Sequence, residues 1–274
     1  MKFAQSTFVY FNYPLQEAIK RLHINGYDGV EIWGGRPHYY RRDLDHELKD
    51  ILALLDEYEM VVPNFIPAQF RYPSLLCSLN EGIRKDSVMY IKDNIDTALQ
   101  LHAASISICP GMLPFGENLL SGWAQLQKSI IELLDYASSA AIKILIEPAH
   151  KAETNLILTV DQCLEMLDRV NSDMLGILVD TGHTHLNNEA LDIIIPRLKN
   201  IPLHIHIDDN NGDADAHMIP CDGKIDYAPL VRALKDIQYN GFISAELGFQ
   251  YTLDPDAAVK TTMERLGEIF YGKE

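Results

Sequence analysis

Basic residues are scarce in this chain. It has 23 lysines and arginines against 39 aspartates and glutamates, which gives a formal net charge of −16 at pH 7. A surface that binds nucleic-acid phosphates or an anionic membrane needs clustered Lys and Arg side chains. We therefore expect no nucleic acid and no membrane among the partners, and we expect a neutral or cationic small molecule as the ligand.

Cysteines and long apolar runs are also few. The four cysteines, Cys77, Cys109, Cys163 and Cys221, form no CxxC pair, a pattern typical of reduced cytosolic thiols. The segment MKFAQSTFVYF has one lysine, no long apolar core and no small-residue cleavage site, so it does not resemble a signal peptide. No stretch approaches the ~18 apolar residues of a membrane span. These absences predict a cytoplasmic protein.

The chain alternates short apolar or β-branched runs with longer amphipathic segments. One such segment places Leu126, Ile130, Leu133, Leu134 and Ala137 at three- and four-residue steps, as a helix with one buried face does. Alternation of strands and helices predicts parallel strands joined by crossover helices. We expect eight strands, at Phe3–Val9, Gly29–Trp33, Val61–Ile66, Ser105–Cys109, Ile142–Ile146, Leu175–Val179, Leu203–Ile207 and Phe242–Glu246.

Glycine is missing where an open, doubly wound sheet would need it. Such a sheet carries a glycine-rich phosphate turn after its first strand, whereas the first predicted strand is followed by YFNYP at 10–14. Eight units in 274 residues average about 34 residues each, a normal size for a βαβ repeat. No Pro/Gly/Ser-rich linker divides the chain. The sequence therefore predicts an α/β fold, a closed (β/α)₈ TIM barrel forming one domain over residues 1–274.

The last four predicted strands each end in a side chain that can bind a metal. Glu147 lies in ILIEP, Asp180 in LVDTGH, His206 in LHIHIDD and Glu246 in SAEL. In a barrel the C-terminal ends of neighbouring strands meet at the face where active sites lie. One imidazole nitrogen and at least three carboxylate oxygens suit a divalent ion. Without that cation, three carboxylates in one pocket would repel one another.

Each of these residues alone has an ordinary explanation. A glutamate at a strand end is commonly salt-bridged, an aspartate before Thr-Gly is commonly a cap, and a histidine in an apolar strand is commonly a hydrogen-bonded core residue. Their occurrence on four consecutive strands favours a metal site. His204, two residues before His206, faces the same way but lies deeper, so we interpret it as an interior residue that supports the site.

At these positions the chain resembles the xylose isomerase-like superfamily of sugar isomerases and epimerases, over essentially its whole length. In that superfamily the ketose 3-epimerases of the tagatose/psicose type bind a metal through Glu, Asp, His and Glu. The resemblance places this set on Glu147, Asp180, His206 and Glu246. The segments GYDGVEIWGGRPH (26–38), EPAHKAETN (147–155) and DAHMIP (215–220) resemble the fructoselysine 3-epimerases more closely.

The resemblance implies inversion at C3 of a ketose. One divalent metal ion, Mn²⁺ first and Mg²⁺, Co²⁺, Zn²⁺, Ni²⁺ or Fe²⁺ as alternatives, would stabilise an enediolate. Glu147 and Glu246 would exchange the C3 proton on opposite faces, because inversion needs a base on each side. Asp180 and His206 would be metal ligands only.

Further residues are implied in substrate binding. Glu153 matches a family glutamate that contacts the substrate carbonyl region, and His183 is placed to donate to O2. Trp33, Arg36 and His38 lie in the WGGRPH segment and are expected at the pocket wall or the distal end of the substrate. Three phenylalanines near predicted strand ends are further candidates for the wall, Phe8, Phe115 and Phe249.

The chain departs from the family at two places. The tagatose-type enzymes have an arginine six residues after the metal histidine, where this chain has Gly212. We expect His217 to fill that space as a substrate-binding residue. The Pro-Gly-x-Gly turn of many family members is replaced here by Pro220-Cys221-Asp222-Gly223, so the turn is expected to differ.

Three alternatives stay open. An aldose–ketose isomerase of the same superfamily would exchange a proton at C1 rather than C3. An apurinic-site endonuclease shares the barrel but needs three metals and histidines at the third and fourth strand ends, which here read NFIP (64–67) and ICPG (108–111). A non-catalytic sugar-binding barrel would not need the complete ligand set. In every case but the endonuclease the partner is a small-molecule sugar, and we expect a homo-oligomer, either a dimer or a tetramer.

Overall fold

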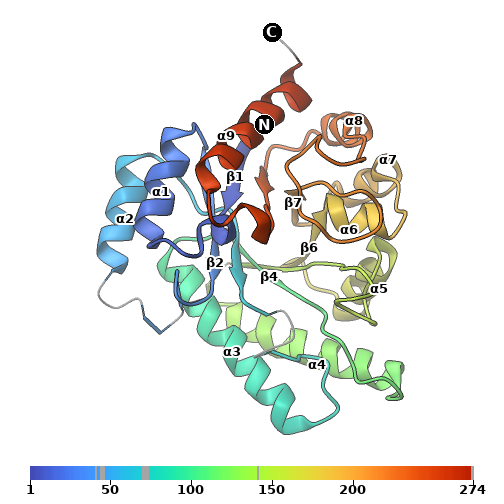
Figure 1. Ribbon diagram of the computed structural model, residues 1–274. Coiled ribbons are helices and arrows are strands. Elements are labelled where there is room, and N and C mark those ends of the chain that lie inside the picture. The colour runs from blue at the N-terminus through green and yellow to red at the C-terminus, as the bar shows by residue number, and fades with distance from the viewer. Residues whose placement is uncertain (41, 44–46, 70–73, 141, 273–274) are drawn as a thin grey trace.

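The computed structural model of the protein describes residues 1–40, 42–43, 47–69, 74–140 and 142–272. Its eight strands pair in parallel, each with the next in sequence, and the first pairs with the last to close a barrel. The predicted (β/α)₈ barrel is therefore confirmed (Figure 1). The strands are β1 (Lys2–Ser6), β2 (Gly29–Gly34), β3 (Phe65–Pro67), β4 (Ser105–Ile108), β5 (Lys143–Ile146), β6 (Leu175–Asp180), β7 (Leu203–Ile207) and β8 (Phe242–Ala245).

Helices surround the barrel on its outside (Figure 1). The three longest in the described ranges are α3 (Glu81–Gln100), α4 (Leu119–Ala137) and α9 (Pro255–Tyr271). None of the described helices is long and apolar enough to cross a membrane. The remaining helical elements are η1 (Thr7–Tyr10), α1 (Leu15–Ile24), α2 (Leu48–Glu57), α5 (Val160–Val170), α6 (Thr181–Leu186), α7 (Leu191–Ile194), η3 (Ile195–Leu198), α8 (Ala228–Asp236) and η4 (Phe249–Tyr251).

Two strands differ from the predicted ranges by more than one residue at one end, each for a local reason. The first was expected to reach Val9 but ends at Ser6, whose side-chain oxygen accepts the amide of Phe8 at 3.3 Å and turns the chain into η1. The third was expected to begin at Val61, but the continuous ladder starts only at Phe65. Pro63 lies between them and has no N–H to donate to the ladder.

The apolar core lies between the barrel and its helices. The predicted face of α4 is buried, with Leu126, Ile130 and Leu133 fully inaccessible to solvent. Burying a side chain of this size contributes roughly 1.5–3 kcal/mol. This layer holds the strands in the register that brings their C-terminal ends together.

The barrel lumen beneath the C-terminal face is polar. Glu31 of β2 accepts a hydrogen bond from Asn64 at 2.6 Å. His204 of β7 lies with its Nε2 2.9 Å from Ser244 Oγ and 3.4 Å from Glu31 Oε2. Because β2 and β7 are not neighbouring strands, this last contact crosses the lumen. His204 is therefore the interior supporting residue that the sequence indicates.

Candidate metal centre

The four predicted metal ligands lie together at the C-terminal ends of their strands. One ligand atom from each of Glu147, Asp180, His206 and Glu246 lies within 4.8 Å of all the others. His206 Nδ1 is 2.9 Å from Glu246 Oε2, 3.5 Å from Glu147 Oε1 and 3.8 Å from Asp180 Oδ2. Ligand atoms around one ion with bonds of ~2.1 Å lie roughly 3.0–3.5 Å apart. The spacing of this quartet therefore suits a single divalent ion.

Strand register sets the common height of these side chains. Asp180 and His206 are direct partners in the β6–β7 ladder. The amide of Glu147 bonds to Ile108 O at 3.1 Å, and that of Glu246 bonds to Ile207 O at 3.2 Å. Both glutamates thus continue the ladder one residue beyond β5 and β8.

Two buried atoms of the quartet have no hydrogen-bond partner. They are Asp180 Oδ2 and His206 Nδ1, both in residues that are fully buried. His206 Nδ1 lies close to Glu246 Oε2, at 2.9 Å, as two ligands of one ion would. Buried polar atoms are nearly always paired, and an ion that completes the site is one explanation when they are not. The residues present therefore fit a metal ion.

Glu31, which the sequence analysis did not select, fixes the orientation of His206. Its Oε1 lies 2.8 Å from His206 Nε2. An ionised carboxylate can only accept, so Nε2 carries the proton and a neutral ring presents the Nδ1 lone pair to the quartet. The signal for Glu31 was an acidic residue in the otherwise apolar strand GVEIW.

Burial and neighbouring charges shift the pKa of each carboxyl group in the quartet. Burial, with the charge of Asp208, raises the pKa of Asp180 to about 7. Burial also raises the pKa of Glu147, although His206 partly offsets this. For Glu246, burial would raise the pKa, but His206 lowers it below the usual value. A bound cation would favour the ionised form of all three.

Glu153, His183 and His217 join a second group beside the quartet. Asp215 is at its centre, with its Oδ2 3.5 Å from His183 Nε2 and 3.0 Å from His217 Nε2. Glu153 Oε2 lies 3.9 Å from His183 Nε2. The other nitrogen of His217, Nδ1, is 3.0 Å from Asp208 Oδ2. Three predicted substrate-binding residues are thus close together, around Asp215 of the segment DAHMIP, which was not among the predicted site residues.

His150 completes this second group and lines a cavity. Its Nε2 lies 3.3 Å from Asp215 Oδ2. Burial would raise the pKa of Asp215, but hydrogen bonds from His150, His183 and His217 hold it well below the usual value. His150, Glu153 and Asp215 line a cavity of about 440 Å³ that opens beside the ends of β5 and β6.

Comparison with known proteins identifies the family. A family profile described as "Xylose isomerase-like TIM barrel" matches residues 19–269. The chain belongs to this family. The family predicted from the sequence motifs is therefore confirmed.

Sugar epimerases are among the relatives within the xylose isomerase-like family. Fructoselysine 3-epimerase of Shigella flexneri is 30% identical over 253 residues, which cover 92% of this chain and 92% of that protein. The protein of the same name from Escherichia coli O157:H7 has the same identity and coverage. The crystal structure of a D-tagatose 3-epimerase-like protein is 27% identical and matches with a TM-score of 0.82, covering 98% of this chain and 99% of that chain.

Trp33 lies in the segment WGGRPH, which resembles the fructoselysine 3-epimerases. It belongs to an aromatic group at the barrel mouth. Its ring centroid lies 5.3 Å from that of Phe8, which is 4.7 Å from that of Phe249. Gly35 gives the indole room, because a Cβ at this position would lie 2.0 Å from it. Phe115, also expected in the wall, is 93% exposed and makes no ring contact among the described residues. The segment therefore has a packing role besides any role in binding.

Arg36 and His38 of the same segment lie apart from the quartet. The Arg36 guanidinium is exposed and pairs with Asp43 through two contacts of 2.7 Å. His38 is buried, with its Nδ1 2.6 Å from Tyr13 O. Burial lowers the pKa of His38 to about 4. The structure thus shows surface and core contacts for these two residues.

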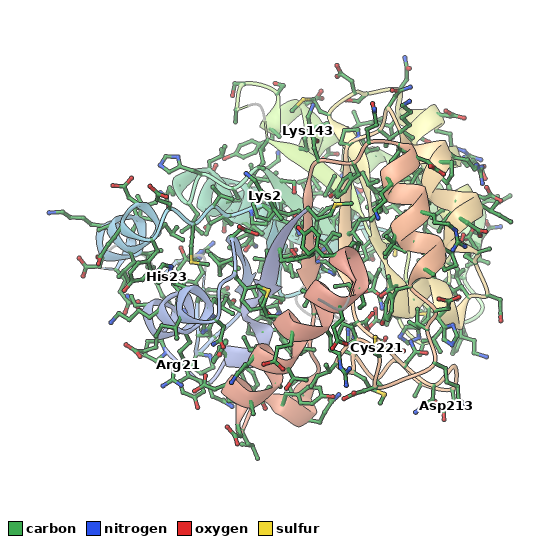
Figure 2. All side chains as sticks on the ribbon, turned by 90° about the horizontal axis from the view of Figure 1, so that it is seen from above. Lys2, Arg21, His23, Lys143, Asp213 and Cys221 are labelled. Carbon is green, nitrogen blue, oxygen red and sulfur yellow. The ribbon has the colours of Figure 1, made fainter. Side chains whose placement is uncertain are left out.

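The turn after β7 keeps a left-handed residue where the family has glycine. Cys221 has φ of +73°, and its amide bonds to Asp209 Oδ2 at 2.9 Å. Figure 2 labels Cys221 and Asp213 on the long loop between β7 and α8. The sequence departure therefore changes the residue at this position but leaves a turn conformation that glycine would also adopt.

Proposed function

We propose that the protein is a divalent-metal-dependent sugar 3-epimerase that inverts C3 of a ketose or ketoamine of the fructoselysine/psicoselysine type. The observation that carries the proposal is the quartet, in which two glutamates from β5 and β8 flank the imidazole of His206. The 3-epimerase names of the relatives support the same reaction class.

The two glutamates are placed to serve two faces of one substrate. Glu147 follows β5 and Glu246 follows β8, with the ligands of β6 and β7 between them. One removes the C3 proton, and the other returns a proton to the opposite face. A divalent ion in the quartet would supply positive charge near the reacting oxygens, which acidifies that proton.

The second group and the cavity are suited to hold the substrate. Glu153 and His183 lie beside the quartet, where they can hydrogen-bond hydroxyl and carbonyl oxygens of a sugar. The cavity of about 440 Å³ is of the size that small-molecule sites have. The aromatic group around Trp33 offers an apolar wall for the alkyl stem of an amine-linked sugar.

Metal removal tests the proposal. The protein is stripped with a chelator, checked by elemental analysis, and incubated with fructoselysine or free fructose, with and without Mn²⁺. We expect the C3 epimer to form only when the ion is restored. Full turnover by verified metal-free protein contradicts the metal requirement. An aldose product in place of the C3 epimer would instead identify an aldose–ketose isomerase.

A further inference from the structure

The long loop between β7 and α8 carries His217, which is expected to bind the substrate. His217 has a φ of +40°, in the left-handed region that residues other than glycine rarely adopt. Such a conformation persists only where the surrounding contacts enforce it. The position of this imidazole therefore depends on what holds the loop.

Asp209, at the start of the loop, holds the residue that follows His217. The amide of Asp209 donates to Met218 O at 3.0 Å, and the amide of Met218 donates to Asp209 O at 2.8 Å. The turn after β8 adds a third bond, because the amide of Gly248 donates to His217 O at 2.9 Å. The backbone on both sides of the His217 side chain is thus fixed.

The carboxyl group of Asp209 holds the far end of the same loop. Its Oδ2 accepts the amide of Cys221 at 2.9 Å, and its Oδ1 accepts the amide of Ile225 at 3.0 Å. The amide of Asn210 also donates to Oδ1, at 2.8 Å. Asp209 is fully buried, and backbone amides occupy both of its oxygens. One side chain therefore ties the beginning of the loop to its end.

The turn at 220–223 is shaped around this carboxyl group. A Cβ on Gly223 would lie 2.3 Å from Asp209 Oδ1 and 2.6 Å from Asn210 O, so a larger residue would displace one of them. Cys221, labelled in Figure 2, is exposed and its side chain needs no such space. This difference explains why the second glycine of the family turn is present in this chain although the first is replaced.

We infer that Asp209 is a positioning residue, which sets the place of His217 for substrate binding through the loop and the turn at Gly223. The inference rests on the proposed function. Asp208, the neighbouring residue, acts differently, because its Oδ2 lies 3.0 Å from His217 Nδ1 and contacts the ring directly. Asp209 touches neither the ring nor the quartet and acts through the backbone of the loop.

The metal quartet does not depend on this anchor. Its nearest ligand in sequence, His206, is held by the β6–β7 ladder opposite Asp180 and by the carboxylate of Glu31. A change at Asp209 should therefore alter substrate binding and leave metal binding nearly unchanged.

Amide hydrogen exchange tests the contacts of Asp209 without any assay of activity. Asp209→Ala removes the three side-chain bonds, whereas Asp209→Asn keeps one carbonyl oxygen. In Asp209→Ala the protection of the Cys221 and Ile225 amides, measured by NMR, should fall at least tenfold, as loss of a bond to a carboxyl group gives. Asp209→Asn should lose less.

Steady-state kinetics tests the positioning role. In Asp209→Ala and Gly223→Ala the KM for fructoselysine should rise about tenfold while kcat changes much less, because a substrate-binding group is displaced. Asp209→Asn should lie between these variants and the unaltered protein. The Kd for Mn²⁺ should stay within about twofold. A residue that only stabilises the fold would lower Tm but leave KM unchanged at temperatures where the variant is folded.

Asp222→Asn is the matched control. Asp222 is exposed on the same turn, and its side chain accepts none of the three amides. This variant should keep the KM and the amide protection of the unaltered protein. The inference is refuted if folded Asp209→Ala keeps the unaltered KM or the protected amides, if its affinity for Mn²⁺ falls as much as its KM rises, or if Asp222→Asn raises KM equally.

Failure of the proposed function is distinguishable from failure of this inference. If the unaltered protein epimerises no sugar but Asp209→Ala exposes the Cys221 and Ile225 amides, the function is contradicted and the anchoring of the loop is supported. If the unaltered protein epimerises and Asp209→Ala does so with the same KM, the function is supported and the positioning role is contradicted.

Discussion

A buried histidine in the first half of the barrel and two buried histidines in the second half have pKa values shifted in opposite directions. On the side of β1 to β4, His38 is buried and has no ion pair with a carboxylate of the described residues, and burial lowers its pKa to about 4. On the side of β5 to β8, burial would also lower the pKa of His183 and His206, but Asp180 raises the first and Glu31 the second well above the usual value. The same carboxylates that would hold a proton on these rings can hold a metal ion beside them.

The two halves of the barrel therefore contribute different parts of the site: one supplies the metal ligands and the other supplies most of the aromatic wall. The ends of β5 to β8 contribute the quartet, whereas β2 and η1 contribute Trp33 and Phe8 to the aromatic group. Two residues cross this division: Phe249, which follows β8, packs against Phe8, and Glu31 lies on β2 yet orients His206 of β7 through the lumen. Variants on each side of the barrel test this division between metal ligands and pocket wall.

Removing either proposed base should lower the rate of epimerisation more than any other change. Replacing Glu147 or Glu246 by Gln keeps the shape and one oxygen ligand but removes a proton carrier, so epimerisation should fall ~10²–10⁴-fold in both directions. Exchange with D₂O should not fall equally. Glu147→Gln should still exchange the C3 proton of one epimer, and Glu246→Gln that of the other. Metal content is measured in both variants; metal-loaded variants without selective exchange would show that the two-base assignment is wrong.

The neutral state of His38 should make stability depend on pH. The pKa of His38 is about 4 in the folded protein against 6.5 ordinarily, so between these values the unfolded chain binds the extra proton. The free energy of unfolding should therefore decrease as the pH falls from 6.5 through 4, by roughly 3 kcal/mol at most. Urea unfolding of the protein and of His38→Gln measures this. Parallel curves for the two proteins across this window would contradict it.

Glu31→Gln tests the contact by which the first half of the barrel orients a ligand of the quartet. Glutamine can no longer force the proton onto His206 Nε2, so metal affinity of the quartet should fall about 10–100-fold. Excess Mn²⁺ should restore much of the turnover, which a folding defect would not allow. His204→Gln is the control, because His204 Nε2 lies 3.4 Å from Glu31 Oε2 but His204 is not one of the four ligands of the quartet. Equal losses in the two variants would mean that the lumen network as a whole, and not the orientation of His206, is responsible.

The smallest effect on catalysis is expected from a change in the aromatic group on the β1 to β4 side. Trp33→Ala removes an indole from the aromatic group, and the KM for fructoselysine should rise about tenfold, as loss of one apolar contact of 1–2 kcal/mol gives. The KM for free fructose should change much less, because it has no alkyl stem to pack there. Steady-state kinetics on both sugars measures the difference. Equal changes would assign Trp33 a purely structural role.

The sequence predicts the barrel and the position of the quartet well, because both follow from local patterns. Strand runs recur at regular intervals, and Glu147, Asp180, His206 and Glu246 each end one run. Glu31 and Asp215 were missed because their partners lie across the lumen or on a long loop, and spacing along the chain does not encode such contacts. The early end of β1 depends on one side-chain cap at Ser6, which a run of apolar letters conceals.

The most direct test of the central proposal is the position of hydrogen exchange in the substrate. Fructoselysine and free ketoses are incubated in D₂O with protein and Mn²⁺, the ion is removed, and deuterium is located by NMR. Metal-dependent proton transfer by the quartet predicts deuterium at C3, with both C3 epimers present and no label without metal. Deuterium at C1, or label-free substrate with fully metal-loaded protein, would contradict a 3-epimerase.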